Sequence, residues 1–141
     1  MHDLTNGLPA TTAGFFTAPC PLVDYWAAHG FVVIQPTYLD SRTVGMALDD
    51  PRAPRVWRFR VEDVKCILDQ VDVLEAAVPG LSGRLDRGRI AAAGHSFGSQ
   101  TTGNLLGLRV RDPQTGIEDD LSDPRIKAGV LLATVGEGGP T

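Results

Sequence analysis

The chain has 141 residues, of which 43% are hydrophobic and 21% charged, and its formal net charge is −4. That length and apolar share are sufficient for the buried core of one domain. The acidic balance excludes nucleic acid as a default partner, because no basic cluster outweighs it.

The N-terminal third of the chain predicts a loop, a short helix and a strand. Residues 1–21 are rich in Gly, Thr, Pro and Ala and follow no period, which predicts an irregular segment. Residues 22–29 predict a short helix that ends at the following glycine. Residues 31–35 (FVVIQ) form an apolar, β-branched run that predicts a strand, and residues 37–54 predict a long surface loop.

A long helix is predicted over residues 55–78, where apolar residues recur at intervals of three and four as on one helical face. Those residues are Val61, Val64, Ile67, Leu68, Val71, Leu74 and Val78. The pair Pro79-Gly80 ends this helix, and Cys66 on it is expected to lie in the core. Neither Cys66 nor Cys20 has metal or redox spacing, which indicates a reducing compartment, and we expect a cytoplasmic protein.

The second half of the chain continues the alternation of strands and helices. Residues 89–93 predict a buried strand, residues 99–110 a helix, and residues 127–133 a second buried strand. This alternation predicts the α/β class, with a doubly wound and mostly parallel sheet.

Two charged stretches are interpreted as solvated surface. A basic run at the start of the long helix is flanked by acidic residues; it consists of Arg52, Arg55, Arg58 and Arg60. The acidic loop at residues 112–123 lacks the glycine and the glutamate of a calcium-binding EF-hand. The chain has no phosphate-binding loop and no apolar run long enough to span a membrane, so we expect no metal, no cofactor and no membrane span.

One pentapeptide, Gly94-His95-Ser96-Phe97-Gly98, indicates a class of reaction. It has the G-x-S-x-G pattern of a nucleophile elbow, in which a serine lies on a tight turn between a strand and a helix. Ser96 is therefore the candidate nucleophile, and the Phe97 N–H is the candidate oxyanion donor. Gly94 and Gly98 would let the strand and the helix approach each other closely. The alternative is a glycine-rich turn of another α/β fold, in which Ser96 only caps the helix.

Around this pentapeptide the chain resembles the α/β-hydrolase superfamily, in its chlorophyllase-like, platelet-activating-factor-acetylhydrolase-like and cutinase-type polyesterase branch. The resemblance is carried by residues 26–36 (WAAHGFVVIQP), 57–76 (WRFRVEDVKCILDQVDVLEA), 89–106 (RIAAAGHSFGSQTTGNLL) and 123–133 (DPRIKAGVLLA). It implies a carboxylic-ester hydrolase with a Ser96 acyl-enzyme. It also implies that residues 1–141 form one incomplete domain, with residues 22–139 as its central portion of about strands 4 to 6.

The same resemblance implies that parts of the catalytic machinery are missing. The family's acid follows the seventh strand and its histidine the eighth, whereas this sequence matches only as far as the sixth. In part of the acetylhydrolase branch the acid ends the sixth strand, but Ala133-Thr134 stand there. The third strand, which would lie between residues 31–35 and residues 89–93, is also not visible. We therefore expect a truncated hydrolase with a gap in its sheet.

The three histidines do not replace the missing base. His95 beside the nucleophile is expected to be a pocket-wall or packing residue, because adjacent residues of that turn point apart. His29 at a helix end is interpreted as a partner of the helix dipole rather than a catalytic residue. His2 lies in the unpatterned N-terminal segment.

Two functions from different classes follow. The first is a serine hydrolase that acts on small-molecule carboxylic esters through Ser96. The second is a catalytically inert hydrolase fragment or pseudo-hydrolase that lacks the acid and the histidine of the triad. A third possibility is that a second chain supplies the histidine across an interface; the sequence leaves the oligomeric state open.

Overall fold

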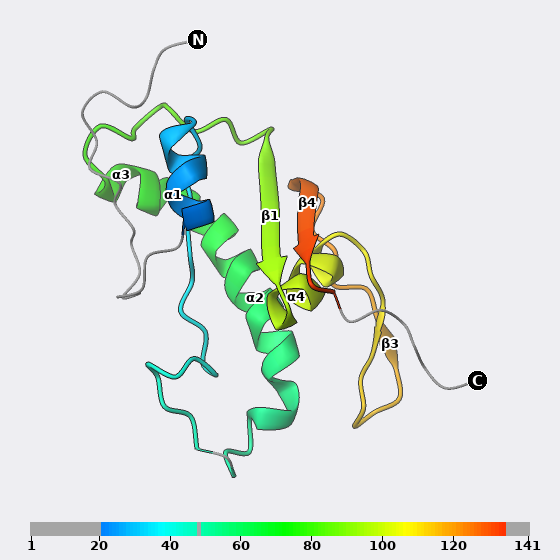
Figure 1. Cartoon of the computed structure of the whole chain (residues 1–141). Coiled ribbons are helices and arrows are strands. Elements are labelled where there is room, and N and C mark those ends of the chain that lie inside the picture. Colours follow the sequence, from blue (N-terminus) through cyan, green and yellow to red (C-terminus); the bar gives the residue numbers. More distant parts are fainter. Residues whose placement is uncertain (1–20, 48, 135–141) are drawn as a thin grey trace.

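The structure is a computed structural model that describes residues 21–47 and 49–134, in which helices pack beside a small parallel sheet (Figure 1). The mixture of helices with a parallel pair of strands confirms the α/β class expected from the sequence. The elements in chain order are α1 (Pro21–Ala28), η1 (Ala53–Arg55), α2 (Val56–Asp69), α3 (Val71–Ala77), β1 (Ile90–His95), α4 (Phe97–Leu105), β2 (Val110–Arg111), β3 (Glu118–Asp119) and β4 (Ile126–Leu132).

The sheet that carries the pentapeptide consists of β1 and β4, which run parallel. Their register extends from Ile90 opposite Ile126 to His95 opposite Leu132, with an irregularity after Ile90. The connection between them passes through α4 and a short antiparallel hairpin of β2 and β3. Both strands that the sequence predicts in the second half of the chain are therefore present: β1 begins one residue later and ends two later than expected, and β4 begins and ends one residue earlier.

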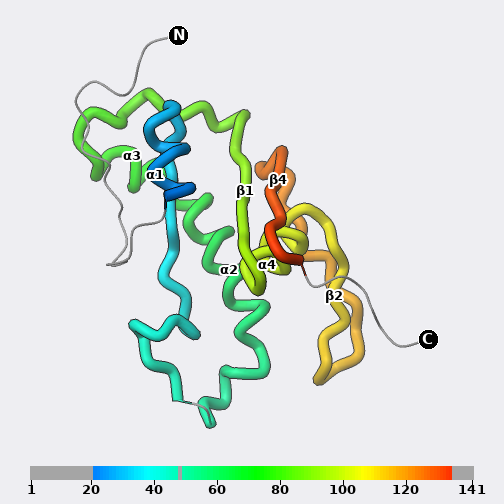
Figure 2. The backbone as a smooth tube through the Cα atoms, in the orientation of Figure 1, coloured from blue at the N-terminus to red at the C-terminus, as the bar shows by residue number. Residues whose placement is uncertain are grey.

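The strand predicted at residues 31–35 is wrong for this structure. These residues are extended, but they hydrogen-bond to no strand among the described residues, and β1 has β4 as its one neighbour there. Phe31, Val32 and Ile34 are 63%, 45% and 43% exposed. A β-branched run becomes a strand only when a neighbouring backbone accepts its hydrogen bonds, and the chain passes here from α1 toward the far end of α2 instead (Figure 2).

The single long helix predicted at residues 55–78 is also corrected. A helical break at Gln70, whose φ and ψ are −107° and 15°, divides it into α2 and α3. The apolar period continues across this break, so periodicity alone could not reveal it. The apolar face predicted for residues 55–78 is otherwise confirmed, because Val61 is completely buried and the other apolar residues of that face are partly buried.

The core lies where α2 and α4 meet the sheet. Val61 of α2, Leu105 of α4 and Ile126 of β4 form its buried centre, and Ile90 and Ala92 of β1 pack against it. The helix expected at residues 99–110 begins earlier and ends earlier, and of the three leucines on which that prediction relied only Leu105 is buried. Polar residues fill most of the buried face of α4 instead; they are Ser99, Thr101, Thr102 and Asn104.

Within the described residues, helices cover one face of the sheet. The parallel register places Ala91 and Ala93 of β1 on the same face as Val130 and Leu132 of β4, and all four are exposed. The opposite face meets α4, where a Cβ added at Gly129 would lie 2.3 Å from Leu106 Cδ1. A doubly wound arrangement needs helices on both faces of the sheet, so it stays a prediction beyond the α/β class.

Two of the four arginines interpreted as solvated are partly buried. Arg58 pairs with Asp119 and lies 3.8 Å from Asp112, while Arg60 pairs with Asp40 at 2.7 Å. The side chains of both arginines are less than 20% exposed. These ion pairs join α2 to distant segments, which a local charge pattern cannot predict.

The acidic loop at residues 112–123 is not simply solvated either, because Asp112 and Asp123 are 4% and 6% exposed. Asp112 Oδ1 accepts a hydrogen bond from the Gln114 N–H at 2.8 Å, which stabilises the turn between β2 and β3. Cys66, expected in the core, is exposed. None of the helices described here combines the length and the apolar character needed to cross a bilayer.

Candidate functional site

Ser96 lies between the last residue of β1 and the first residue of α4. Its φ and ψ are 54° and −118°, a combination that residues with a side chain rarely adopt. Its backbone N–H donates to the Leu132 carbonyl oxygen at 2.9 Å, so the pairing with β4 continues up to the turn itself. Ser96 is exposed, and it follows the end of β1, where α4 begins (Figure 1). The order of strand, strained serine and helix is the geometry that a nucleophile elbow requires.

The two glycines of the pentapeptide have different roles. A Cβ added at Gly94 would lie 2.0 Å from the Gly98 carbonyl oxygen and 2.6 Å from the Ser99 backbone nitrogen. Only glycine therefore fits at position 94 in this close approach of strand and helix. A Cβ added at Gly98 would meet no described heavy atom within 4 Å. The close approach expected to exclude a side chain is therefore confirmed at Gly94, and among the described residues it is absent at Gly98.

Ser99, a residue that sequence reasoning did not single out, ties the turn together. It is completely buried, and its Oγ lies 2.8 Å from the Gly94 carbonyl oxygen and 2.5 Å from that of Leu132. One hydroxyl proton can serve either acceptor, so Ser99 links α4 to both strands. Its position on the first turn of the helix after the pentapeptide is the one sequence signal for this role, and serine at that position is common for other reasons.

Phe97, whose N–H is the candidate oxyanion donor, is the first residue of α4. An N–H in the first turn of a helix has no acceptor within the helix, and the helix dipole adds partial positive charge there. Phe97 is 37% exposed, and the guanidinium of Arg60 lies over its ring. Developing negative charge near Ser96 would thus meet a helix N-terminus, while the oxyanion role itself stays a prediction.

No catalytic triad is assembled among the residues that the structure describes. The Nδ1 of His29 bonds to the Tyr25 carbonyl oxygen at 2.7 Å, and the two rings stack, which agrees with the expected role at a helix end. His95 ends β1 and is exposed, and neither of these histidines hydrogen-bonds to Ser96. His2 lies outside the described residues. The described chain therefore places the candidate nucleophile beside the candidate oxyanion donor, and neither described histidine hydrogen-bonds to Ser96.

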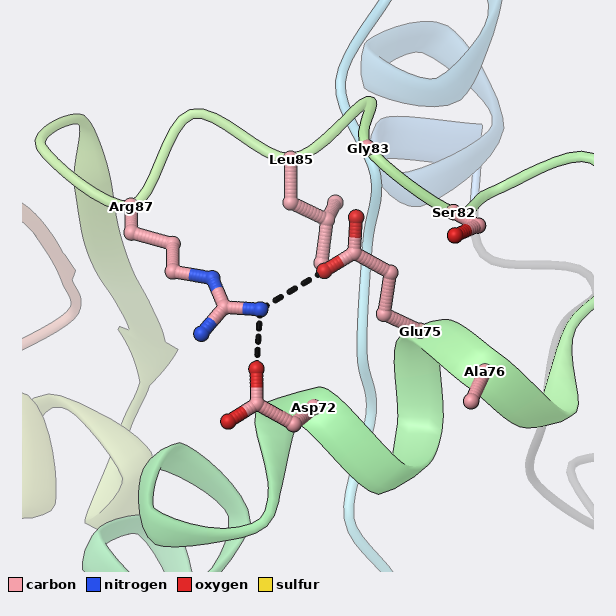
Figure 3. A pocket seen from close by; sticks show the side chains of 7 residues that line it. All are labelled: Asp72, Glu75, Ala76, Ser82, Gly83, Leu85 and Arg87. Carbon is pink, nitrogen blue, oxygen red and sulfur yellow. Dashed lines mark hydrogen bonds and ion pairs between the residues drawn. The ribbon is translucent and has the colours of Figure 1, made fainter.

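The described residues contain no group of three or more His, Cys, Asp or Glu side chains arranged to hold a metal ion. A hollow does lie between α3 and the loop that leads to β1 (Figure 3). There Arg87 binds both Asp72 and Glu75, and Glu75 is 7% exposed. The Arg87 guanidinium, aided by the backbone N–H groups of residues 83–85, holds the pKa of Glu75 below its usual range. These charges satisfy one another, which indicates a structural ion cluster.

Comparison with protein-family models, with curated proteins and with solved structures finds no match to this chain.

Proposed function

We propose that this chain carries the nucleophile of a serine hydrolase that acts on small-molecule carboxylic esters. The observation that carries the proposal is the backbone of Ser96, which has a φ of 54° at an exposed turn between a parallel strand and a helix. Strain of this kind costs about 1–3 kcal/mol and is concentrated at functional sites. A serine that only capped the helix would need no such strain, and it makes no side-chain capping bond here.

The chemistry is acyl transfer. The Ser96 Oγ attacks the carbonyl carbon of the ester, its proton passes to a base, and the alcohol leaves to give an acyl-enzyme that water then hydrolyses. The Phe97 N–H at the start of α4 stabilises the negative charge on the carbonyl oxygen. The parallel pair β1 and β4 is consistent with strands five and six of an α/β-hydrolase sheet, and the close packing at Gly94 fits the same arrangement.

The first prediction concerns the nucleophile itself. A fluorophosphonate probe should label the chain at Ser96, and intact-mass and peptide mass spectrometry would locate the label. Ser96→Ala should abolish labelling, whereas Ser99→Ala, which removes the neighbouring buried hydroxyl, should keep the site of labelling unchanged. Labelling that survives Ser96→Ala would overturn the assignment.

A second candidate function is an inert hydrolase scaffold. It is favoured by a specific observation: neither His29 nor His95, the histidines of the described residues, hydrogen-bonds to Ser96. On this view the chain shows no turnover of short-chain p-nitrophenyl esters above that of Ser96→Ala. A specific activity that rises with protein concentration would instead support a histidine supplied by a second copy of the chain.

A further inference from the structure

A cluster of three segments surrounds the side chain of Arg60 on α2. Its guanidinium carbon lies 4.5 Å from the ring centroid of Tyr38 and 4.5 Å from that of Phe97. The Arg60 Nη2 and Nε donate to the two carboxylate oxygens of Asp40 at 2.7 Å and 3.0 Å. We call these four residues, Tyr38, Asp40, Arg60 and Phe97, the arginine clasp. The clasp joins the chain before α2, the middle of α2 and the first residue of α4.

The clasp differs from an ordinary surface ion pair in burial and geometry. The side chains of Arg60 and Asp40 are 15% and 19% exposed, and the contact between them uses two parallel hydrogen bonds. Burial also raises the pKa of Tyr38, opposed by the nearby Arg60 charge. A planar guanidinium can stack on aromatic rings and bind a carboxylate with its edge at the same time, which the ammonium of lysine cannot do. The combination of these contacts therefore depends on arginine in particular.

The position of Phe97 gives the clasp a consequence for the elbow. Phe97 follows Ser96 directly and is 37% exposed. The stacked Arg60 supplies a fixed contact for that ring at the first turn of α4. The ring is joined to the Phe97 backbone through two rotatable bonds, so a fixed ring limits how far the backbone N–H can move.

We propose that Arg60 is a positioning residue, which acts through the Phe97 ring to aim the Phe97 N–H at the oxyanion that forms beside Ser96. The effect of Arg60 on the reaction rests on the proposed function, whereas its contact with the two rings does not. One measurement therefore tests whether Arg60 positions Phe97, and a second tests whether this positioning affects the reaction at Ser96.

The first measurement needs no activity. In ¹H–¹⁵N spectra of the full chain, the Arg60 Nε–H should be shifted upfield by the stacked rings and should exchange slowly with water. Arg60→Lys should move the Phe97 amide resonance, whereas Arg87→Lys should not. Arg87 is a matched control, because it is also a partly exposed arginine in ion pairs, but it precedes the first residue of β1, whereas Phe97 follows the last. A Phe97 amide that is unmoved in Arg60→Lys overturns the positioning role.

The second measurement is the rate of fluorophosphonate labelling at Ser96 over a range of probe concentrations. Arg60→Lys should lower the maximal labelling rate roughly tenfold to a hundredfold, since misplacing an oxyanion donor acts on the transition state. The probe concentration at half-maximal rate should stay unchanged. Tyr38→Phe, which keeps the stacked ring, should label at the wild-type rate. An equal loss in Arg60→Lys and Arg87→Lys would show a general loss of structure and would overturn the proposal.

The outcomes separate the two statements. Wild-type labelling no faster than that of Ser96→Ala refutes the proposed function, while the resonances of Phe97 still decide whether Arg60 positions it. Normal labelling of Arg60→Lys beside a wild type that labels at Ser96 refutes the positioning role and leaves the nucleophile in place.

Discussion

At the scale of single residues, the turn at Ser96 shows how a strained backbone is held. Its φ of 54° would relax if strand and helix could separate, but the backbones of residues 94 and 98 are in close contact. The buried hydroxyl of Ser99 bonds across the same turn. The strain at Ser96 is therefore maintained by packing from both sides, as expected where the surrounding structure determines one conformation.

This packing predicts opposite effects at the two glycines. Gly94→Ala should destabilise the fold by roughly 1–3 kcal/mol, because its methyl group would overlap the Gly98 carbonyl and force strand and helix apart. Gly98→Ala places its methyl group in open space on a helix, and should be neutral or stabilising by up to about 1 kcal/mol. Urea unfolding of both variants followed by circular dichroism would check this. Equal destabilisation by both would contradict the close approach.

At the scale of elements, the turn that leads into β4 depends on one carboxylate. Asp123 is 6% exposed, its N–H donates to the Leu105 carbonyl oxygen at the end of α4, and its carboxylate binds Arg125. The hydrogen bonds from Arg125 lower the pKa of Asp123 from its ordinary 3.8 to about 2. Arg125 also binds Asp69 at the end of α2 at 2.7 Å, so this pair connects three elements.

The lowered pKa sets the sign of a pH dependence. A carboxylate whose pKa falls on folding stabilises the fold fully above its unfolded pKa near 4, and that contribution is lost as the pH falls toward 2. Asp123→Asn should therefore lower the free energy of unfolding by about 1–3 kcal/mol at pH 7, with a smaller difference from wild type near pH 2. The exposed Asp49→Asn is the control. A deficit in Asp123→Asn that stays constant between pH 7 and pH 2 would refute this explanation.

Element by element, the sequence predicted what depends on local pattern and missed what depends on distant contact. The strands at β1 and β4, the serine between strand and helix, and the apolar face of α2 all follow from period and turn chemistry. The break at Gln70 does not follow from them, because the apolar period continues across the break. Nor does the lack of a strand at residues 31–35, because among the described residues no neighbouring strand pairs with them.

The candidate site divides in the same way. Ser96 and Gly94 are visible in a five-residue motif whose geometry is local. The arginine clasp joins residues 38, 60 and 97, and only the folded chain brings them together. Arg60 has the sequence appearance of a basic surface run, and no local signal distinguishes it from Arg52, whose partner Asp50 is two residues away.

At the scale of the whole molecule, the described residues leave one face of the parallel sheet without a cover. Val130 and Leu132 of β4 are 44% and 38% exposed, and their partners on that face of β1, Ala93 and His95, are exposed too. Parallel sheets are ordinarily covered on both faces, so apolar area of this kind is unusual for a free surface. The opposite face, which meets α4, is packed closely at Gly129.

This asymmetry predicts where an apolar probe binds. The full chain in native buffer should enhance the fluorescence of anilinonaphthalene sulfonate, and Val130→Thr should reduce that enhancement, because it removes apolar area while keeping a β-branched side chain suited to a strand. Val73→Thr, which alters a valine 63% exposed on α3 and outside the sheet, should leave the signal at the wild-type level. Far-ultraviolet circular dichroism should be the same for all three proteins, since both valines lie outside the buried core. Equal fluorescence from Val130→Thr and wild type would mean that this face is covered in solution, and the dye would then report another surface.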